Sequence, residues 1–573
     1  MENKREEVGQ DSRQEGVHGD QEEETVLNIN IGILGHVDSG KTTLARALSS
    51  EAATAAFDKS PQSRARGITL DLGFSAFRVP VPAPAGVPGF PRAETVQFTL
   101  VDCPGHATLV RTIIGGAQLV DTLLLVVDAT RGFQPQTAEG LAVGTLTARR
   151  LVVALTKTDL LPAATRPAAL ARAARCVTRV LEHTPFAGAT IVPVCARTPD
   201  TGSTSTDDNN GIEQLRQALL ATIDEQLAEE RKKARAEPLL VAVDHCFAVR
   251  GQGTVATGTV LRGSLAPGDT VEAGGTHTTY RVRSLQVFRR PVTCARAGDR
   301  VGMGLAGLAP AALERGLLAA PGTLPVAAAL VGRAARVPWH RAPCRSKTKF
   351  HVTVAHATVL ATVHFCRQAD APADKGKEWA GLSAEYEYLE ELPPATSEDS
   401  GDDEKESNNV WALVVLEQPV PCPQGALFVA SHLDADATGS SSSSSSAGGC
   451  RIAFHGHAAA SFATAEALFA GLRVFSRRAR EGTIERAVDP RTAIARGLYK
   501  KEAACTPFLG LTVTVPGYAP DPALTARIDS PFGKSGKFKI VFAHDVTAKA
   551  IAGQKIVLSY KKYRFARHDK LIQ

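Results

Sequence analysis

The sequence predicts a multidomain protein, in which an α/β domain with a parallel sheet precedes two antiparallel β-barrels and a mainly-β, barrel-like C-terminal domain. The chain has 573 residues, more than one hydrophobic core usually organises. Short apolar runs alternate with helical stretches at first, and from residue 238 short alternating strands are separated by Gly-rich turns. The domain boundaries that we expect are 27–237, 238–322, 323–472 and 473–573.

The α/β domain is predicted from short, almost wholly apolar runs that follow one another along the chain. They read VLNINIGILG, TVQFTLVDCPG, TLLLVVDAT, RLVVALTKTD and ATIVPVCAR. Helix-like crossovers separate them, which is typical of strands in a parallel sheet that is covered on both faces. A charged helix at 223–237 then closes the domain.

Three segments lack the apolar residues that would offset the entropy of ordering them. The first is the acidic tail at 1–26, and the others are insertions in the second barrel, near 370–409 and 437–449. The first insertion is acidic and the second is rich in serine. We expect all three segments to be disordered.

Composition limits the class of protein. No run of about 18 uninterrupted apolar residues could span a bilayer, and the acidic N-terminus is unlike a signal peptide. We expect no membrane attachment and a cytoplasmic location, with nuclear traffic left open. The 10 cysteines include no Cys-x-x-Cys pair, so the sequence indicates neither a zinc site nor a disulfide framework.

The positive charge is concentrated at the C-terminal end. Residues 471–573 hold 20 Lys and Arg against 8 Asp and Glu, a net charge of +12, whereas the whole chain carries +6. A lopsided basic domain is typical of nucleic-acid binding, with a solvated basic face as the alternative.

A phosphate-binding motif directly follows the first predicted strand. The sequence GHVDSGKT at 35–42 matches Gly-x-x-x-x-Gly-Lys-Thr. In that context the backbone N–H groups can cradle phosphates, Lys41 can reach the β and γ groups and Thr42 can ligate Mg²⁺. The candidate residues are Gly35, His36, Val37, Asp38, Ser39, Gly40, Lys41, Thr42 and Thr43.

Two further motifs indicate that the nucleotide is GTP. In DCPGH, Asp102 would hold the Mg²⁺ shell and the N–H of Gly105 would sense the γ-phosphate. In TKTD, Asp159 can accept two hydrogen bonds from the guanine edge, and adenine lacks that donor pair. Three motifs in this order, each after a predicted strand, predict a P-loop GTPase domain.

Two residues are candidates for catalysis of GTP hydrolysis. Thr69, in RGIT, can close over Mg²⁺ and the γ-phosphate and open after hydrolysis. His106 follows the γ-phosphate-sensing turn and can orient the attacking water. A lone loop histidine is more often a bystander, so the role of His106 depends on the neighbouring motif.

Longer stretches resemble known families. GHVDSGKTTL, RGITLDLGF and DCPGHATLVRTIIGGAQLVD resemble translational GTPases of the elongation factor Tu superfamily. VDHCFAVRGQGTVATGTV, CRIAFHGH, SPFGKSGKFKI and YKKYRFARHDK are similar to eukaryotic selenocysteine-specific elongation factors. This resemblance implies a monomeric factor that binds GTP and Mg²⁺, delivers selenocysteyl-tRNA to the ribosome at recoded UGA codons and hydrolyses GTP there. It also implies that the last domain couples to the protein bound to the selenocysteine insertion element.

The resemblance further implies an aminoacyl pocket made by Asp244, His245 and Arg300. A selenol is more acidic than a thiol and would arrive as an anion, which Arg300 and a protonated His245 could stabilise. Asp244 would either keep His245 protonated or orient Arg300, and both roles remain open. The alternative is an ion pair that only stabilises the barrel.

Other positions of the families' motifs differ in this chain. The guanine motif usually begins with Asn, so Thr156 is expected to lose an amide that tethers the loop and contacts the base. The last guanine motif is CAR in place of Ser-Ala-Lys, with the backbone of Ala196 making most of the contact. The candidate guanine-site residues are Thr156, Lys157, Asp159, Cys195 and Ala196.

Exposed basic residues are candidates for contacts with the tRNA backbone, or simply for a solvated face. They are Arg345, Lys347 and Lys349 in the second barrel and Lys534, Lys537 and Lys539 in the last domain. Three alternative functions remain: an initiation-type tRNA-carrying GTPase, a scaffold that binds tRNA or ribosomes without hydrolysis, and a sulfate-activating GTPase. The basic last domain disfavours the first and third, and the intact phosphate motifs disfavour the second.

Overall fold

The predicted strands of the α/β domain do form one sheet. In the computed structural model, β1 pairs in parallel with β4 and β5, and β6 and β7 extend the sheet on the β5 side. The sequence did not predict β3, which runs antiparallel to β4, or β2 beside it, so one edge of the sheet is mixed. The strands are β1 (Val26–Gly35), β2 (Glu51–Ala52), β3 (Gly73–Pro80), β4 (Thr95–Asp102), β5 (Thr122–Asp128), β6 (Arg150–Thr156) and β7 (Thr190–Pro193). The structure describes residues 26–52, 72–81, 86–91, 93–103, 119–196, 211–251, 253–310, 313, 315–369, 379–394, 409–432, 450–499, 506–516, 524–533, 536–565 and 571–572.

Helices cover both faces of this sheet. Apolar residues of α1 and α6 pack on one face, in a core with the alternate residues of β1 and β4. Residues of α4 and α5 pack on the other face, against β5 and β6. The helices are α1 (Lys41–Leu48), α4 (Pro135–Thr147), α5 (Arg166–Leu181), α6 (Ile212–Leu220) and α7 (Glu225–Ala236). No described helix is both long enough and apolar enough to cross a membrane.

The second domain is a closed β-barrel, as predicted from the sequence. Its strands follow the order β11-β16-β8-β9-β15-β12, and pairing of β11 with β12 closes the barrel. The short β13 extends β12, and β10 pairs with β14. The strands are β8 (Leu240–Val249), β9 (Gly253–Arg262), β10 (Ser264–Leu265), β11 (Thr270–Ala273), β12 (Thr278–Val287), β13 (Arg290–Val292), β14 (Ala295–Arg296), β15 (Arg300–Ala306) and β16 (Gly316–Ala319).

The third domain closes in the same way, through the order β19-β23-β24-β17-β22-β20 and the pairing of β19 with β20. Additional strands lie outside this ring: β18 pairs with β24, and β21 pairs with β20. The elements are β17 (Val326–Arg333), β18 (Ala335–Arg336), β19 (Thr348–Val354), β20 (Ala357–Gln368), β21 (Glu385–Leu389), β22 (Val410–Pro421), β23 (Leu427–Ser431), β24 (Ile452–Phe462) and α9 (Ala465–Gly471).

One expectation about this domain was wrong. The interval near 370–409 was expected to be a disordered insertion, but it contains the strand β21, whose side chains Tyr386 and Tyr388 are buried. Tyr386 stacks on Trp379, which in turn contacts Trp411 edge to face. The segment EYEYLEE is acidic in composition, but its alternate tyrosines are buried. Their burial supplies the apolar area that stabilises the strand. The remaining expected insertions and the acidic tail lie outside the described residues, apart from 379–394, 409 and Val26.

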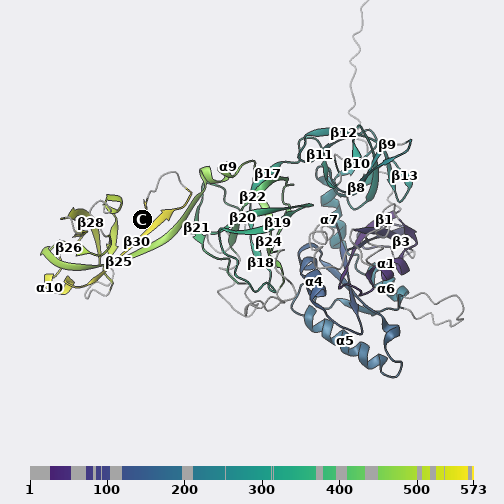
Figure 1. Ribbon diagram of the computed structural model, residues 1–573, viewed down its shortest axis with the longest axis horizontal. Coiled ribbons are helices and arrows are strands. Elements are labelled where there is room, and N and C mark those ends of the chain that lie inside the picture. The colour runs from purple at the N-terminus through teal and green to yellow at the C-terminus, as the bar shows by residue number, and fades with distance from the viewer. Residues whose placement is uncertain are drawn as a thin grey trace, which may run out of the picture.

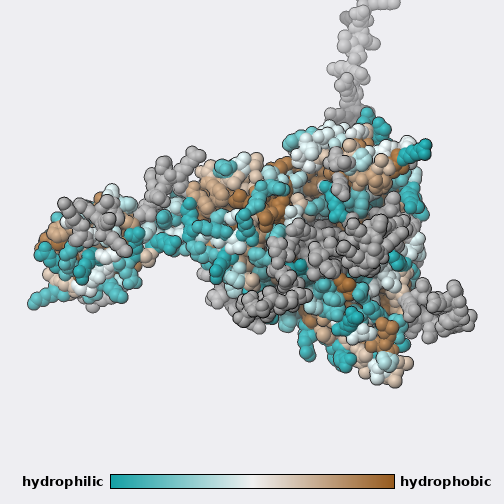
Figure 2. Space-filling view, in the orientation of Figure 1, coloured by the Kyte–Doolittle hydropathy of each residue, from teal (hydrophilic) through white to brown (hydrophobic). Residues whose placement is uncertain are grey.

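The C-terminal domain is a third closed barrel, with strand order β25-β26-β29-β28-β27-β30 and pairing of β25 with β30. The long strand β25 begins beside β21 of the third domain and ends inside the last barrel, so a continuous strand joins the two domains (Figure 1). Figure 2 shows hydrophilic residues gathered at this narrow junction. The elements are β25 (Arg473–Asp489), β26 (Thr492–Arg496), β27 (Thr512–Thr514), β28 (Thr525–Phe532), β29 (Lys537–Phe542), α10 (Ala548–Ile551), β30 (Lys555–Tyr563) and β31 (Leu571–Ile572).

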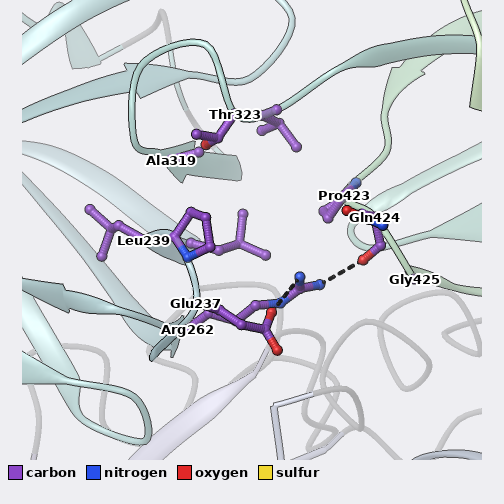
Figure 3. A pocket seen from close by; sticks show the side chains of 11 residues that line it. Glu237, Leu239, Arg262, Ala319, Thr323, Pro423, Gln424 and Gly425 are labelled. Carbon is purple, nitrogen blue, oxygen red and sulfur yellow. Dashed lines mark hydrogen bonds and ion pairs between the residues drawn. The ribbon is translucent and has the colours of Figure 1, made fainter. Parts of the chain in front are cut away.

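A pocket of about 620 Å³ marks the seam where the second and third domains meet the end of α7. Arg262 crosses this seam: its guanidinium is 2.9 Å from a carboxylate oxygen of Glu237 and donates to the backbone oxygen of Gln424 at 3.2 Å (Figure 3). Arg262 therefore connects the first three domains through polar contacts, in a pocket that is also lined by apolar residues.

A buried ion pair connects α4 to the third domain. The guanidinium of Arg451 donates to both carboxylate oxygens of Glu139, each at 2.9 Å, and the two residues are only 7% and 9% exposed. Apolar residues surround the pair, among them Val143 of α4 and Ile452 of β24. Charges of this kind are stabilising only as a pair, because each is expensive to bury alone.

Replacing Arg451 with methionine should destabilise the contact between these domains by about 3–5 kcal/mol, because the Glu139 carboxylate stays buried without its cation. Thermal unfolding should show a lower midpoint for Arg451→Met and recovery when Glu139→Leu is added. Arg491→Met, which removes an exposed pair with Asp545, is the matched control and should change little. An unchanged midpoint in Arg451→Met would contradict the prediction.

Candidate functional site

The predicted phosphate loop lies between β1 and α1, where the carboxyl ends of the parallel strands meet. Its backbone takes left-handed conformations at Asp38, with φ of 59°, and at Gly40, with φ of 91°. A Cβ atom on Gly35 would lie 2.3 Å from the backbone oxygen of Val126, so only glycine fits there. The N–H of Val37 donates to Gln136 of α4 at 3.2 Å, which ties the loop to that helix.

Lys41 lies inside this loop. Its ammonium donates to the backbone oxygens of Gly35 at 3.0 Å and of His36 at 2.7 Å, and the residue is 7% exposed. Burial lowers the pKa of Lys41, while the carboxylate of Asp102 acts in the opposite direction. The lysine is therefore held as a pre-positioned donor at the place where the motif predicts the phosphates.

The two predicted metal ligands that the structure describes are in contact. The Thr42 hydroxyl, in the first turn of α1, donates to the Asp102 carboxylate, at the end of β4, at 2.7 Å. A hydroxyl and a buried carboxylate beside a phosphate loop are the oxygen donors that Mg²⁺ prefers. This donor set fits the ion that the motif implies.

The guanine loop differs from the expectation at Thr156. Its hydroxyl donates to the backbone oxygen of Ser39 at 2.6 Å and is 3.3 Å from that of Val127, so it ties the end of β6 to the phosphate loop. Contrary to expectation, a buried hydroxyl therefore keeps the tether, while the expected loss of the base contact stays a prediction.

The other guanine-site candidates surround the same end of the sheet. Lys157 has φ of 58° and pairs with Asp128 at 2.9 Å, while Asp159 is exposed in the short 3-10 helix Thr158–Leu160. Cys195 and Ala196 follow β7, in a segment that starts with a hydrogen bond from Val194 to Leu155 of β6. The exposed carboxylate of Asp159 is available to a base. Three candidates of the GTPase motifs, Thr69, Gly105 and His106, lie outside the described residues.

The three residues of the predicted aminoacyl pocket do come together. Arg300, at the start of β15, donates to the two carboxylate oxygens of Asp244 at 2.6 and 3.3 Å, and His245 Nδ1 is 2.8 Å from the same carboxylate. Asp244 and His245 are consecutive on β8, where side chains normally alternate between faces. The pairing of β8 with β9 shifts between Val243 and His245, and this bulge lets both side chains serve one site.

The electrostatics of this site follow from the contact geometry. Burial alone would raise the pKa of Asp244, but the charge of Arg300 and the hydrogen bonds from His245 and Arg300 hold that pKa below its usual value. Asp244 contacts both partners, so it is placed to orient Arg300 and His245, and the protonation of His245 stays a prediction. Asp244 and Arg300 are buried, whereas the His245 side chain is 30% exposed.

Sequence reasoning missed Phe74, which lies on β3 of the α/β domain. The Arg300 guanidinium sits 3.2 Å above the centre of the Phe74 ring, so the pocket of the second domain rests on the first. The neighbouring Asp299 accepts a hydrogen bond from Asn28 of β1 at 2.6 Å. Phe74 is the last residue of the motif RGITLDLGF, but nothing in that motif indicates a contact with Arg300.

The predicted tRNA-contacting residues that the structure describes are exposed or half-buried, and Arg345 lies 4.0 Å from Glu391. Arg345, Lys347 and Lys349 are exposed around the start of β19, although Lys349 pairs with Glu417 at 2.7 Å. Lys537 and Lys539 alternate along β29 with the buried Phe538 and Ile540, and Lys537 pairs with Glu485 at 2.7 Å. The remaining candidate is Lys534, which lies outside the described residues.

Family models match this arrangement domain by domain. The model for the elongation factor Tu GTP binding domain matches residues 27–236, and that for elongation factor Tu domain 2 matches 253–318. With the phosphate loop and guanine loop in place, the chain is a translational GTPase of the elongation factor Tu type.

Two further models cover the rest of the chain. They describe the third domain of eukaryotic selenocysteine-specific elongation factors, at residues 331–456, and the eEFSec C-terminal RIFT domain, at 470–570. The selenocysteine-specific elongation factor of Mus musculus is 42% identical over 534 residues, covering 90% of this chain and 88% of the mouse protein. The chain belongs to the family of selenocysteine-specific elongation factors, as the resemblance predicted.

Archaeal relatives extend the likeness. The selenocysteine-specific elongation factor of Methanocaldococcus jannaschii is 33% identical over 339 residues, covering 59% of this chain and 66% of that protein. Crystal structures of translation elongation factor SelB from Methanococcus maripaludis, with a GTP analogue and in the apo form, superpose with TM-scores of 0.67 and 0.64. Each covers 94% of this chain and 99% of its own, at 23% and 24% identity, which confirms the predicted fold.

Replacing Thr156 with alanine should weaken GTP binding about 2- to 10-fold, because one buried hydrogen bond, of about 0.5–1.5 kcal/mol, no longer holds Ser39. Titration with a fluorescent GTP analogue measures this effect. Thr156→Ser keeps the hydroxyl and should bind GTP as the unsubstituted protein does. Equal affinities for Thr156→Ala and Thr156→Ser would show that the tether is irrelevant.

Proposed function

We propose that this protein, loaded with GTP and Mg²⁺, carries selenocysteyl-tRNA to the ribosome at recoded UGA codons and hydrolyses GTP there. The observation that carries this proposal is the Asp244–Arg300 pair with its adjoining histidine, placed against the domain that holds the nucleotide motifs. The mouse relative is named a selenocysteine-specific elongation factor, and this name agrees with a site that is selective for one aminoacyl group.

In the nucleotide site, Lys41 and the loop N–H groups would hold the phosphates. Thr42 and Asp102 would hold Mg²⁺, and this ion would neutralise the negative charge that develops on the phosphates. Asp159 would read guanine. We propose that Thr69 and His106 order the attacking water when the ribosome engages the factor, so that hydrolysis is ribosome-stimulated.

In the aminoacyl site, the buried Asp244–Arg300 pair fixes the position of His245. A carboxylate only accepts hydrogen bonds, so Nδ1 of His245 donates to Asp244, and the side chain of His245 stays 30% exposed. Asp244 stays ionised at neutral pH, because the charge of Arg300 and the hydrogen bonds to the carboxylate hold its pKa below the ordinary value. An anionic selenolate gains from the nearby cation, and a neutral seryl hydroxyl gains less.

Partners and location complete the proposal. The basic last domain would couple the factor to the protein bound to the selenocysteine insertion element, and the basic residues around β19 would contact the tRNA backbone. The factor would act as a monomer in the cytoplasm without membrane attachment, and nuclear traffic is compatible with this function.

Replacing Arg300 with alanine should remove the preference for the selenocysteyl group. Loss of a charge-assisted hydrogen bond, worth about 1.5–3 kcal/mol, should cost about 10- to 150-fold in affinity for selenocysteyl-tRNA. Dissociation constants should be compared at fixed salt for that tRNA, for the same tRNA carrying serine and for an ordinary elongator aminoacyl-tRNA.

The matched control is Arg283→Ala, an exposed arginine of the same barrel, which should leave the preference intact. Equal binding of the three tRNAs by the unsubstituted protein would contradict the proposed carrier function. A preserved preference in Arg300→Ala would contradict the role of this pocket.

A further inference from the structure

Helix α5 carries a cluster of positive charge that has no role in the proposed nucleotide and aminoacyl sites. Residues 166–181 include four arginines and no aspartate or glutamate. Val177 and Leu181 are buried against the sheet, whereas Arg172, Arg175 and Arg179 are exposed.

The three exposed arginines share one face. At about 100° per residue they fall within about 60° of one another around the helix axis, opposite the buried side, and they are spaced by about 4.5 and 6 Å along it. Within the described part of the chain, none of them forms an ion pair with a carboxylate. Like charges three and four residues apart on a helix repel each other, so this face lowers the stability of the unbound protein. An anionic partner would relieve that repulsion.

The character of the face distinguishes between possible anionic partners. Its exposed residues near the arginines are the small Ala168, Ala171 and Cys176 and, at the C-terminal end of the helix, Glu182. Protein interfaces depend on large apolar or aromatic anchors seated in pockets, and this face of α5 offers none. A phosphate backbone needs only donors on a surface that it can approach closely, and the planar guanidinium matches phosphate in two-point contacts.

The position of α5 separates it from the tRNA cargo. The helix packs beside β6, whereas the aminoacyl pocket rests on β3, and the strands β4, β1 and β5 lie between these two strands. Figure 1 shows α5 at the outer end of the α/β domain, away from the second domain. An RNA at this helix is therefore not the aminoacyl end of the cargo.

We propose that Arg172, Arg175 and Arg179 form a contact surface for the phosphate backbone of ribosomal RNA. The proposal deepens the proposed function and rests on it, because it names RNA phosphates that the GTP-loaded factor meets on the ribosome. It assigns no base-reading role to α5, since backbone contacts carry charge but no sequence information.

The test compares three forms of the full-length protein, each loaded with a non-hydrolysable GTP analogue. The first is unsubstituted. The second carries Arg172→Gln, Arg175→Gln and Arg179→Gln. The control carries Lys232→Gln, Lys233→Gln and Arg281→Gln, exposed residues whose loss removes the same charge from elsewhere. Dissociation constants are measured over a range of salt for ribosomes, for ribosomal RNA stripped of protein and for selenocysteyl-tRNA.

The α5 variant should bind ribosomes and stripped ribosomal RNA more weakly than the unsubstituted protein does. The slope of its plot of log affinity against log salt concentration should be smaller in magnitude by about 2, because each of the three lost phosphate contacts contributes about 0.7. Its affinities for GTP and selenocysteyl-tRNA should match those of the control. A salt slope equal to the control's would overturn the proposal. Weaker binding to ribosomes with unchanged binding to stripped RNA would also overturn it, in favour of an acidic protein partner.

These outcomes are separable from failure of the proposed function. If the unsubstituted protein showed no preference for selenocysteyl-tRNA, the carrier function would fail whatever the α5 variant did. If that preference held and the α5 slope did not change, only the ribosomal RNA surface would fail. A fourth variant with glutamate at the three positions should weaken RNA binding further, because it adds repulsion to the loss of attraction.

Discussion

The pairing of Asp244 with Arg300 above Phe74 is the interaction on which the organisation of the first two domains depends. It places a buried carboxylate, a buried guanidinium and an aromatic face in one stack, so that neither charge is left without a partner. The stack joins β8 and β15 of the barrel to β3 of the α/β domain. Separating the barrel from the α/β domain would therefore remove the aromatic face that covers the Arg300 guanidinium.

The same strand connects this stack to the nucleotide site. Gly73, the residue before Phe74, lies opposite Asp102 in the pairing of β3 with β4. Asp102 is the carboxylate that accepts from Thr42. A movement of β4 would thus be passed through the pairing with β3 to Phe74, the residue that supports Arg300. The pairing of β3 with β4 therefore connects the candidate Mg²⁺ ligands with the Asp244–Arg300 pair.

Much of this could be predicted from the sequence, because the nucleotide motifs are local. A phosphate loop needs particular residues within eight positions, and strand ends in a parallel sheet bring such loops together. Phe74 could not be predicted, since its role arises from a contact between domains. β21 was missed because its glutamates, which lie beside the basic strands β25 and β30, hid the alternating tyrosines. Thr156 was misjudged because a hydroxyl replaced an amide at a buried position.

The junction of the last two domains follows a related principle. Glu385 of β21 pairs with Lys561 at 2.8 Å and with Arg473 at 2.7 Å, so acidic residues of the third domain neutralise part of the basic last domain. Arg564 stacks on Tyr388, 3.7 Å from its ring centre. Part of the +12 charge is therefore neutralised at the junction of the two domains.

The most direct test of the coupling between nucleotide and aminoacyl pocket is the ratio of affinities for selenocysteyl-tRNA and for the same tRNA carrying serine, measured once with a GTP analogue and once with GDP. We expect a large ratio with the GTP analogue and a much smaller one with GDP, because the support of Arg300 comes from the nucleotide domain. An equal ratio in the two states would contradict it.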